Sequence, residues 1–481
     1  MRKIGIILLI MCFCVHFVPA PVESTELEIA TEITQHSDDI GIQDNFAVAS
    51  GSHTLNAQNP LVGTDKLVDN VRSAIIYDSN SQTLLYAWNP DQQMYPASLV
   101  KIMTALLAIE KGALEEIVTV KQSAINAIPQ DAVSAKLVVD EMLSLEDLLY
   151  CLLVGSANDA AAVIAEHISG SQSAFVDEMN NYALSLGCTA THFTNVHGLH
   201  DDNQHTTARD SAKILDAALR NPIFRTIFTA SGYTVQPTNQ SPERKLNNGN
   251  SMMDTSSKLY YDSRVIGGRT GVTKDGRRCL AAAAESNGML IVSVVMGSES
   301  VYKEDGYTAI RIGGYKETSH LLDACLDGYK AAQILCSEQI VRQIPIDGAE
   351  NDLFLAPESS IVTVLPIDVT IEDLEFRYSD NDMTLPISKG QHISDVQIWH
   401  GNTCVGQTQL FAMNAVYHAG YNHSSNHEMT NNSLPAVIWI SFLIVAAIAI
   451  IFIGIRFSGE IKAILVRMRT RRYRKSRKRI K

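Results

Sequence analysis

The fold is decided by residues 96–110, which read Pro-Ala-Ser-Leu-Val-Lys-Ile-Met-Thr-Ala-Leu-Leu-Ala-Ile-Glu. The apolar run after Ser98 predicts a buried helix over 97–111. Lys101 follows Ser98 by one helical turn, so both side chains lie on the same face. Apolar neighbours partly desolvate the Lys101 ammonium and lower its pKa. A base of this kind activates a serine, which is unreactive on its own.

Two interpretations of this stretch stay open. In the first, Ser98 is a nucleophile at the start of a helix, where the partial positive field of the helix N-terminus favours it. In the second, the helix is an ordinary one, and Lys101 lays its methylenes on apolar surface with its ammonium in solvent. The Ser-x-x-Lys spacing alone decides nothing, since Ser300 and Lys303 repeat it without an apolar helix behind them.

A second triplet, Ser156-Ala-Asn158, lies at a break between two apolar stretches that predict helices at 144–153 and 158–168. A hydroxyl and an amide at such a junction can relay a proton and hold a peptide group. The alternative is that Ser156 or Asn158 is simply the N-cap of the second helix.

A third segment, Gly267-Gly-Arg-Thr-Gly-Val272, precedes a strand predicted at 278–285. Small residues let a substrate backbone lie against a strand edge. The cation of Arg269 and the hydroxyl of Thr270 can bind a carboxylate there. The alternative is a glycine-rich turn with an exposed arginine.

Strands at both ends with helices between them predict an α+β domain over 66–330. A hairpin opens the domain, and a second hairpin near its end turns at Asn287-Gly288, the strongest short hairpin signal. The strands are expected at 73–78, 83–87, 278–285 and 289–297, and the remaining helices at 173–186 and 208–220.

The rest of the exterior chain has a different pattern. Residues 21–65 are polar, lack periodicity and predict a flexible linker, with order beginning near Val71. Residues 336–420 predict a small all-β domain, and residues 421–433 a second polar linker. The β segments are expected at 361–367, 392–399 and 403–410.

The two ends predict export and anchoring. Residues 1–20 combine Arg2 and Lys3 with an apolar run and a small residue at Ala20, as in a secretory signal peptide. Residues 434–455 predict one transmembrane helix, and the basic tail 456–481 is expected in the cytoplasm and at anionic lipid headgroups. The catalytic domain is therefore expected outside a bacterial cell membrane.

Charge is divided unevenly along the 481 residues. The formal net charge is −13, whereas the tail from Arg456 contributes +11 and the first three residues +2, which leaves −26 for residues 4–455. Nucleic-acid-binding domains are basic, so an acidic exterior part excludes that class of partner. The membrane helix accounts for the basic tail.

Ser-x-x-Lys, Ser-x-Asn and a basic-Thr-Gly triplet occur here in that order, 58 and then 113 residues apart. The chain thereby resembles the serine penicillin-recognising enzymes, and more closely the low-molecular-mass penicillin-binding proteins that are D-alanyl-D-alanine carboxypeptidases. Supporting matches are Ser-Ala-Asn-Asp-Ala-Ala, Thr-His-Phe-Thr-Asn-Val-His-Gly-Leu, His-Thr-Thr-Ala-Arg-Asp and Gly-Arg-Thr-Gly-Val-Thr. The resemblance implies a β-lactamase/transpeptidase-like catalytic domain, an antiparallel sheet flanked by helices, over roughly residues 68–300.

The resemblance also implies how acylation proceeds. Ser98 attacks the carbonyl between the two terminal D-alanines of a peptidoglycan stem peptide, and Lys101 takes its proton. The backbone N–H groups of Ser98 and Val272 form the oxyanion hole. β-Lactam antibiotics acylate the same serine.

The remaining roles follow from the same resemblance. Ser156 passes the proton to the leaving D-alanine and Asn158 orients the peptide. The triplet Arg269, Thr270 and Gly271 holds the terminal carboxylate. The family usually has lysine at the first triplet position; arginine keeps the charge, but it stays protonated and does not transfer a proton. We expect retained activity with altered tuning.

Three other functions are weighed against this one. A β-lactamase needs a deacylating glutamate, but residues 186–200 contain none and Glu166 lies only ten residues beyond Ser156. A wall protein that binds penicillin without catalysis would be compatible with Arg269. A metalloenzyme could use clustered histidines, but their polar loop lacks a zinc signature, so we expect no metal or cofactor. The histidines are His192, His197, His200 and His205.

Cysteine usage adds little. Eight cysteines fall to six beyond the signal peptide, and none forms a Cys-x-x-Cys pair. Cys151 and Cys279 lie in apolar runs, which predicts buried free thiols.

Overall fold

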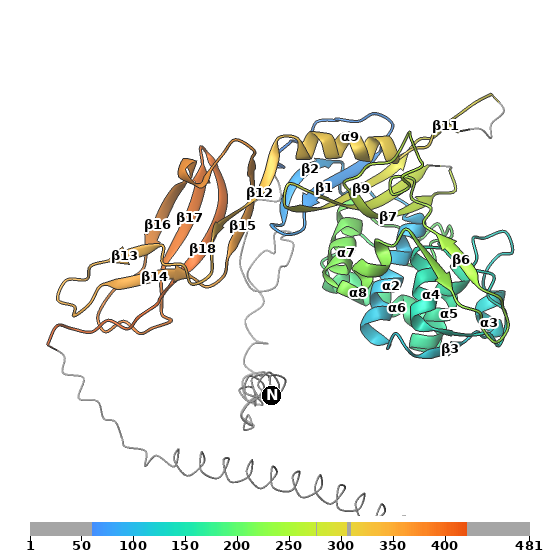
Figure 1. Cartoon of the computed structure of the whole chain (residues 1–481), viewed down its shortest axis with the longest axis horizontal. Helices are drawn as coiled ribbons and strands as arrows, with labels where there is room; N and C mark the ends of the chain where they lie inside the picture. The colour runs from blue at the N-terminus through green and yellow to red at the C-terminus, as the bar shows by residue number, and fades with distance from the viewer. Residues whose placement is uncertain (1–59, 276, 305–308, 421–481) are drawn as a thin grey trace, which may run out of the picture. The chain divides into compact units, whose positions relative to one another are not determined.

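The computed structural model describes residues 60–275, 277–304 and 309–420 (Figure 1). One five-stranded sheet has the order β2-β1-β9-β8-β7, and every neighbouring pair is antiparallel. The strands are β1 (Ser73–Asp78), β2 (Thr83–Trp88), β7 (Val265–Val272), β8 (Arg278–Ser286) and β9 (Met289–Ser298). The α+β prediction with an antiparallel sheet is confirmed.

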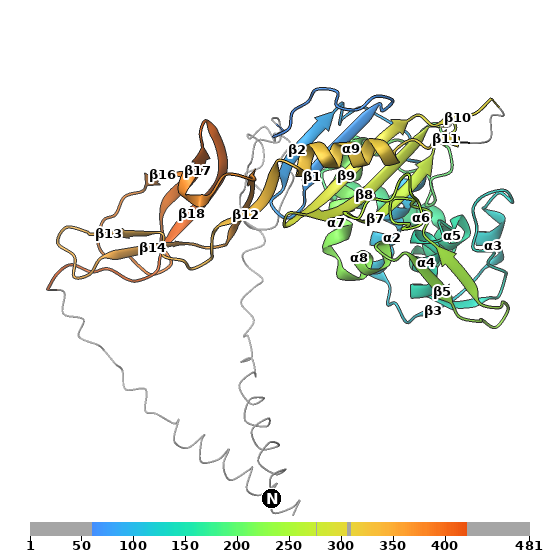
Figure 2. The same ribbon diagram turned by 45° about the horizontal axis from the view of Figure 1, so that its top comes forward.

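Both faces of this sheet are buried. Successive strand side chains point to opposite faces, so Ile75 and Tyr77 belong to one apolar core and Ala74 and Ile76 to another. The first core contains most helices, and the second is covered by α9 (Figures 1 and 2). This is why β8 and β9 read as continuous apolar runs rather than alternating ones.

The helices on the first face are η2 (Ala97–Leu99, a 3-10 turn), α2 (Val100–Lys111), α3 (Gln122–Asn126), α4 (Leu145–Leu153), α5 (Asn158–Ser169), α6 (Gln172–Ser185), α7 (Ala208–Arg220) and α8 (Pro222–Phe228). Five of them, α2, α4, α5, α6 and α7, agree with the predicted segments. On the second face lies α9 (Tyr315–Leu326). The short helices α3 and α8, and α9, were not predicted.

Short ladders complete this part of the chain. They pair β3 (Ile117–Thr119) with β4 (Met142–Ser144), β5 (Gly232–Val235) with β6 (Arg244–Asn247), and β10 (Val301–Tyr302) with β11 (Ala309–Arg311). Leu61 N and Val62 N donate to Leu84 O and Leu85 O, so the chain already pairs with β2 upstream of the predicted start near Val71.

A second group of strands has its own apolar core. β12 (Tyr329–Leu335) pairs with β15 (Ile361–Pro366), and a five-stranded antiparallel sheet has the order β13-β14-β18-β17-β16. These strands are β13 (Arg342–Ile344), β14 (Leu353–Pro357), β16 (Glu375–Asp380), β17 (His392–His400) and β18 (Thr403–Ala412), with the 3-10 turn η3 (Ile371–Asp373). The predicted β segments fall on β15, β17 and β18, and β12 covers the expected boundary between 330 and 336.

The predicted signal peptide (1–20) and transmembrane helix (434–455) lie outside the described residues, as do most of the first linker, the second linker and the basic tail. No helix within residues 60–420 has the length and apolar character needed to cross a membrane.

Candidate active site

Ser98 lies in the 3-10 turn η2, which runs directly into α2. Two glycines press against this turn from other parts of the chain. A Cβ on Gly271 of β7 would lie 2.8 Å from Ser98 N, and one on Gly198 would lie 2.0 Å from Ala97 O. Side chains at these positions are therefore excluded, and the backbone of β7 approaches Ser98 closely.

Lys101 is fully buried beneath Ser98. Its Nζ donates to Ser98 Oγ (3.2 Å), Asn158 Oδ1 (2.8 Å) and the backbone oxygen of His197 (2.6 Å). Burial, together with the charge of Arg269, holds the Lys101 pKa well below its ordinary value, although Asp159 opposes this shift. The alternative in which the Lys101 ammonium lies in solvent is therefore wrong. Burial favours the neutral amine, which is the form of lysine that can accept a proton.

The Ser156–Asn158 triplet joins α4 to α5. Ser156 adopts a left-handed φ of 59°. The N-cap of α5 is Ala157, which has no side-chain cap, so the N-cap alternative is wrong. Asn158 is buried, and both its backbone N and its Nδ2 donate to Val133 O (2.8 and 2.9 Å), which leaves Oδ1 for Lys101.

Arg269 is buried inside β7 rather than exposed on a turn, so that alternative is also wrong. NH1 donates to Leu153 O (2.8 Å) and NH2 to Ser156 Oγ, whereas Nε has no partner among the described residues. Burial lowers the Arg269 pKa to about 10. The guanidinium therefore keeps its positive charge at neutral pH.

A cleft of about 670 Å³ brings the predicted residues together. All of them line it except Lys101, which lies below its floor; the lining members are Ser98, Ser156, Asn158, Arg269, Thr270, Gly271 and Val272. The sequence reasoning missed two further walls, residues 131–133 and 247–250, and the His197 carbonyl. Every residue has a backbone carbonyl, so residue type cannot identify one that acts in a site. The only signal for this loop is the family resemblance of residues 191–199.

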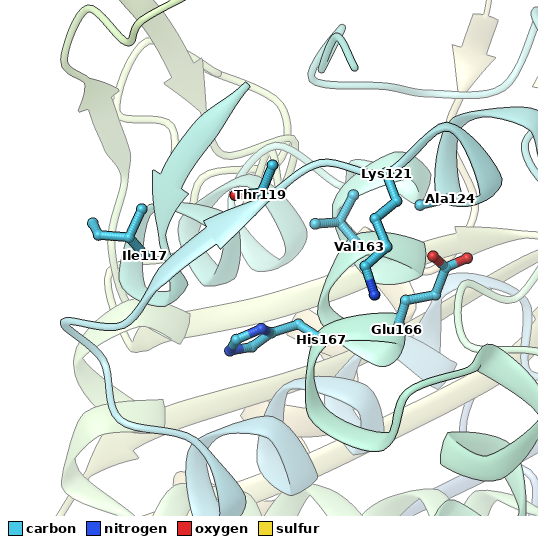
Figure 3. Close-up of a pocket in the computed structure, with 7 residues that line it drawn as sticks. All are labelled: Ile117, Thr119, Lys121, Ala124, Val163, Glu166 and His167. Carbon is cyan, nitrogen blue, oxygen red and sulfur yellow. The ribbon is translucent and has the colours of Figure 1, made fainter. Parts of the chain in front are cut away.

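Glu166 lies outside this cleft. It belongs to a separate pocket of about 270 Å³ with Lys121 and His167 (Figure 3). Its carboxylate accepts hydrogen bonds from Ser123 Oγ (2.6 Å) and Gln172 Nε2 (3.2 Å). A glutamate placed there cannot reach an acyl group on Ser98, which argues against the β-lactamase alternative.

The clustered histidines are tied into the loop beside the cleft. His192 and His205 pair across a β-bridge, and His200 Nε2 lies 2.9 Å from Asp202 Oδ1. Burial, with a smaller contribution from Lys101, lowers the pKa of His197 to about 4. Residues 60–420, apart from 276 and 305–308, contain no group of three or more potential metal ligands.

The six cysteines of the described chain are free. Cys151 and Cys279 are buried, as predicted, and so are Cys188 and Cys325. Burial raises the pKa of Cys279 to about 11, as expected for a structural thiol.

Comparison with known proteins agrees with this geometry. The family described as D-alanyl-D-alanine carboxypeptidase, peptidase family S11, matches residues 64–300. D-alanyl-D-alanine carboxypeptidase DacA of Haemophilus influenzae is 30% identical over 384 residues, which cover 78% of this chain and 92% of that protein. DacD of Escherichia coli is 28% identical over 357 residues, covering 72% and 86%.

Comparison with solved structures also agrees with this geometry. Penicillin binding protein 5 from Haemophilus influenzae superposes with a TM-score of 0.61 at 29% identity, covering 74% of this chain and all of that one. Its fold is the transpeptidase/β-lactamase-like fold of penicillin-binding proteins, with mixed helices and strands. The chain therefore belongs to the D-alanyl-D-alanine carboxypeptidases, peptidase family S11.

Proposed function

We propose that this serine-type carboxypeptidase removes the terminal D-alanine from peptidoglycan stem pentapeptides through an acyl-enzyme on Ser98. One observation carries the proposal: a fully buried lysine lies 3.2 Å from a serine hydroxyl at the floor of a substrate-sized cleft. Burial favours the neutral amine, and a neutral amine is the base that a serine needs.

The surroundings of Lys101 support its role as the proton acceptor. A neutral amine can donate to Asn158 Oδ1 and His197 O and turn its lone pair toward Ser98 Oγ. The Ser98 proton then moves to Nζ as Oγ attacks the peptide carbonyl, and the two oxygens already face the ammonium that forms. The N–H groups of Ser98 and Val272 hold the developing oxyanion, where one donor is worth about 3–4 kcal/mol.

Ser156 and Arg269 act on the D-alanine that leaves. Since Arg269 NH2 donates to Ser156 Oγ, this hydroxyl keeps its own hydrogen for another acceptor, the nitrogen of the departing D-alanine. Arg269 supplies the positive charge that attracts the terminal carboxylate, and Thr270 with Gly271 offers a hydroxyl and an unobstructed backbone beside it. Water then releases the acyl group. β-Lactams, which this family is expected to bind, acylate Ser98 in place of the peptide.

The proposed domain plan places this chemistry at the outer face of a bacterial membrane. The signal peptide 1–20 exports the chain, and linker 21–65 leads to the catalytic domain 66–330 and the small all-β domain 336–420. Linker 421–433, transmembrane helix 434–455 and tail 456–481 anchor it, with the tail on cytoplasmic lipid. Composition alone supports the terminal segments.

The direct test is release of D-alanine from a stem pentapeptide by the full-length chain in detergent. We expect release by the wild type and none by Ser98→Ala, with labelled penicillin attached to Ser98 in the wild type alone. A wild type that takes the penicillin label but releases no D-alanine would instead indicate a penicillin-binding wall protein without catalysis.

Arg269 is tested separately. Since a permanently charged guanidinium can anchor a carboxylate but not pass a proton, wild type and Arg269→Lys should both hydrolyse a D-Ala-D-Ala peptide, with different KM values. An inactive wild type that is revived by Arg269→Lys would contradict this role.

A further inference from the structure

The two walls of the cleft carry charges of opposite sign. Arg269 in β7 and Lys274, two residues after the end of that strand, provide the cations of one wall, called here the β7 wall. Among the described residues that line the cleft, Asp131 provides the only carboxylate, on the opposite wall formed by residues 131–133. Asp131 is exposed, and its carboxylate has no hydrogen bond or ion pair to any described residue. The cleft therefore offers one unpaired anion to whatever binds it.

Asp131 lies close to the reacting centre. Ala132 N donates to Pro129 O (3.1 Å), which closes a turn around Asp131. Two residues further on, Val133 O accepts both hydrogen bonds from Asn158. Two residues of chain span at most about 7 Å, so the backbone of Asp131 is within this distance of the carbonyl that fixes Asn158.

The wall that carries Asp131 is held in place from below. Asp159, the residue after Asn158, accepts hydrogen bonds from Ser134 Oγ (2.7 Å), Ala135 N (2.9 Å) and Leu137 N (3.0 Å). The carboxylate is 3% exposed. These bonds fix the loop against the first turn of α5, so Asp131 is presented from a preorganised segment rather than a free one.

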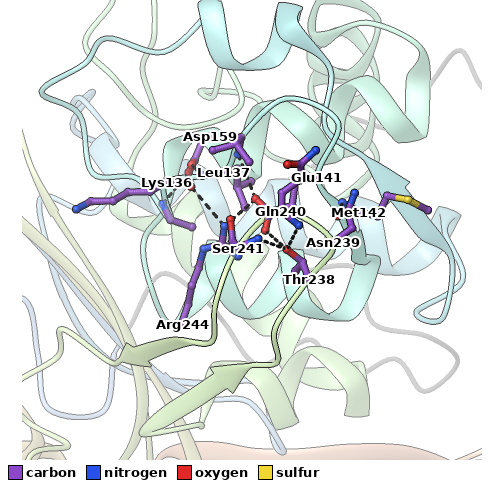
Figure 4. Close-up of polar contacts among 12 residues, drawn as sticks. Lys136, Leu137, Glu141, Met142, Asp159, Thr238, Asn239, Gln240, Ser241 and Arg244 are labelled. Atoms are coloured by element: carbon purple, nitrogen blue, oxygen red, sulfur yellow. Dashed lines mark hydrogen bonds and ion pairs between the residues drawn. The ribbon is translucent and has the colours of Figure 1, made fainter.

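A second clamp joins the same loop to the hairpin β5–β6 (Figure 4). Glu141 is fully buried and accepts from Arg244 NH2 (2.7 Å) and Thr238 Oγ1 (2.7 Å). Asn239 is linked to both Met142 N and Asp140 O. Both walls that sequence reasoning missed, 131–133 and 247–250, thus belong to one connected unit.

The direction of the peptide follows from the proposed function, on which this inference rests. The leaving D-alanine lies at the cationic β7 wall, where Arg269 attracts its carboxylate. The acyl part, on the other side of the scissile bond, passes Asn158 and reaches the wall of Asp131. A carboxylate there complements a positive charge on that part of the substrate.

We propose that Asp131 is a specificity-determining residue, which binds the ammonium group of the residue that precedes D-Ala-D-Ala. The preferred acyl donors then carry a diamino acid with a free side-chain amine at this position. An exposed ion pair of this kind changes kcat/KM by about twofold to fivefold, and the preference weakens as salt screens it.

Two peptides that differ only in this charge provide the test. The first is Nα-acetyl-L-lysyl-D-alanyl-D-alanine, with a free ε-ammonium, and the second is its Nα,Nε-diacetyl counterpart. The full-length wild type should favour the first by the stated factor at low salt, and Asp131→Asn should bring the ratio of kcat/KM values close to one. Asp177→Asn, which removes an exposed carboxylate from α6, should keep the wild-type ratio.

The possible outcomes distinguish a failure of the Asp131 subsite from a failure of the proposed carboxypeptidase function. Equal hydrolysis of both peptides by the wild type, or an unchanged ratio in Asp131→Asn, would overturn the subsite and leave the carboxypeptidase intact. Hydrolysis of neither peptide would overturn the proposed function and the subsite with it. A preference that persists at high salt would also count against an ion pair at Asp131.

Discussion

Asp159→Asn is the substitution that tests how the site is built. The carboxylate accepts three hydrogen bonds from the loop, two of them from backbone N–H groups, and a fourth from Ala160 N (3.0 Å). An amide has only one oxygen and turns an NH2 group toward N–H donors. At least two donors then lose their acceptor, one of them the buried N–H of Leu137 or Ala160, at about 1–3 kcal/mol each.

We therefore expect the free energy of unfolding to fall by roughly 3 kcal/mol. For a domain of this size that is a decrease in melting temperature of roughly 6–12 °C. The assay is thermal unfolding of the full-length chain followed by circular dichroism. The matched control is Asp177→Asn, which changes an exposed aspartate and should leave the melting temperature within about 1–2 °C of the wild type.

The same variant should move a pH profile. The Asp159 carboxylate raises the Lys101 pKa against the larger effects of burial and Arg269. In the proposed mechanism acylation needs neutral Lys101, so the rate should fall as the pH drops through this pKa. Without the Asp159 charge the pKa is lower still, and the acidic limb should shift to lower pH. A melting temperature and an acidic limb that both match the wild type would refute the assigned role of Asp159.

Three further substitutions probe single contacts. Gly271→Ala places a methyl group 2.8 Å from Ser98 N and should slow penicillin acylation more than tenfold, while circular dichroism stays unchanged. Glu141→Gln leaves the Arg244 charge without its buried partner and should destabilise the chain by about 3 kcal/mol in urea unfolding. Asn287→Ala removes a residue with φ 51° that donates from Nδ2 to the backbone oxygens of Leu326 and Tyr329, and should lower the unfolding free energy by about 1–2 kcal/mol. Asn287→Asp keeps the turn preference but cannot donate to these carbonyls, so it should lose at least as much.

Elements with a strong local signal could be predicted from the sequence. The helix over 97–111 follows from an uninterrupted apolar run, and the β8–β9 hairpin from Asn287-Gly288, whose φ angles are both positive. Strand β7 is the contrasting case. Its three glycines have low strand propensity, so the local sequence also fits a turn, and pairing with β8 holds it as a strand.

Some groups of the candidate site could likewise be predicted from the sequence, and others could not. Ser98, Lys101 and Asn158 could be found because their chemistry depends on side-chain type and spacing. The two carbonyls that position them, His197 O and Val133 O, could not, since any residue provides a carbonyl and only tertiary structure brings it within reach. The N-cap interpretation of Ser156 failed for a related reason. Its left-handed backbone, φ 59°, takes the hydroxyl away from the start of α5 and toward Arg269.

Burial and residue type together decide which of the two basic side chains near Ser98, Lys101 or Arg269, can give up a proton. Burial lowers its pKa to about 10, in the same direction as that of Lys101, yet the guanidinium still holds its proton at neutral pH. A lysine at the same buried place would start from a lower intrinsic pKa and could give its proton away. In this chain the two cations near Ser98 are therefore not equivalent. The proposed mechanism therefore assigns the exchangeable proton to Lys101, whose pKa is lowered by burial, and a constant positive charge beside Ser156 to Arg269.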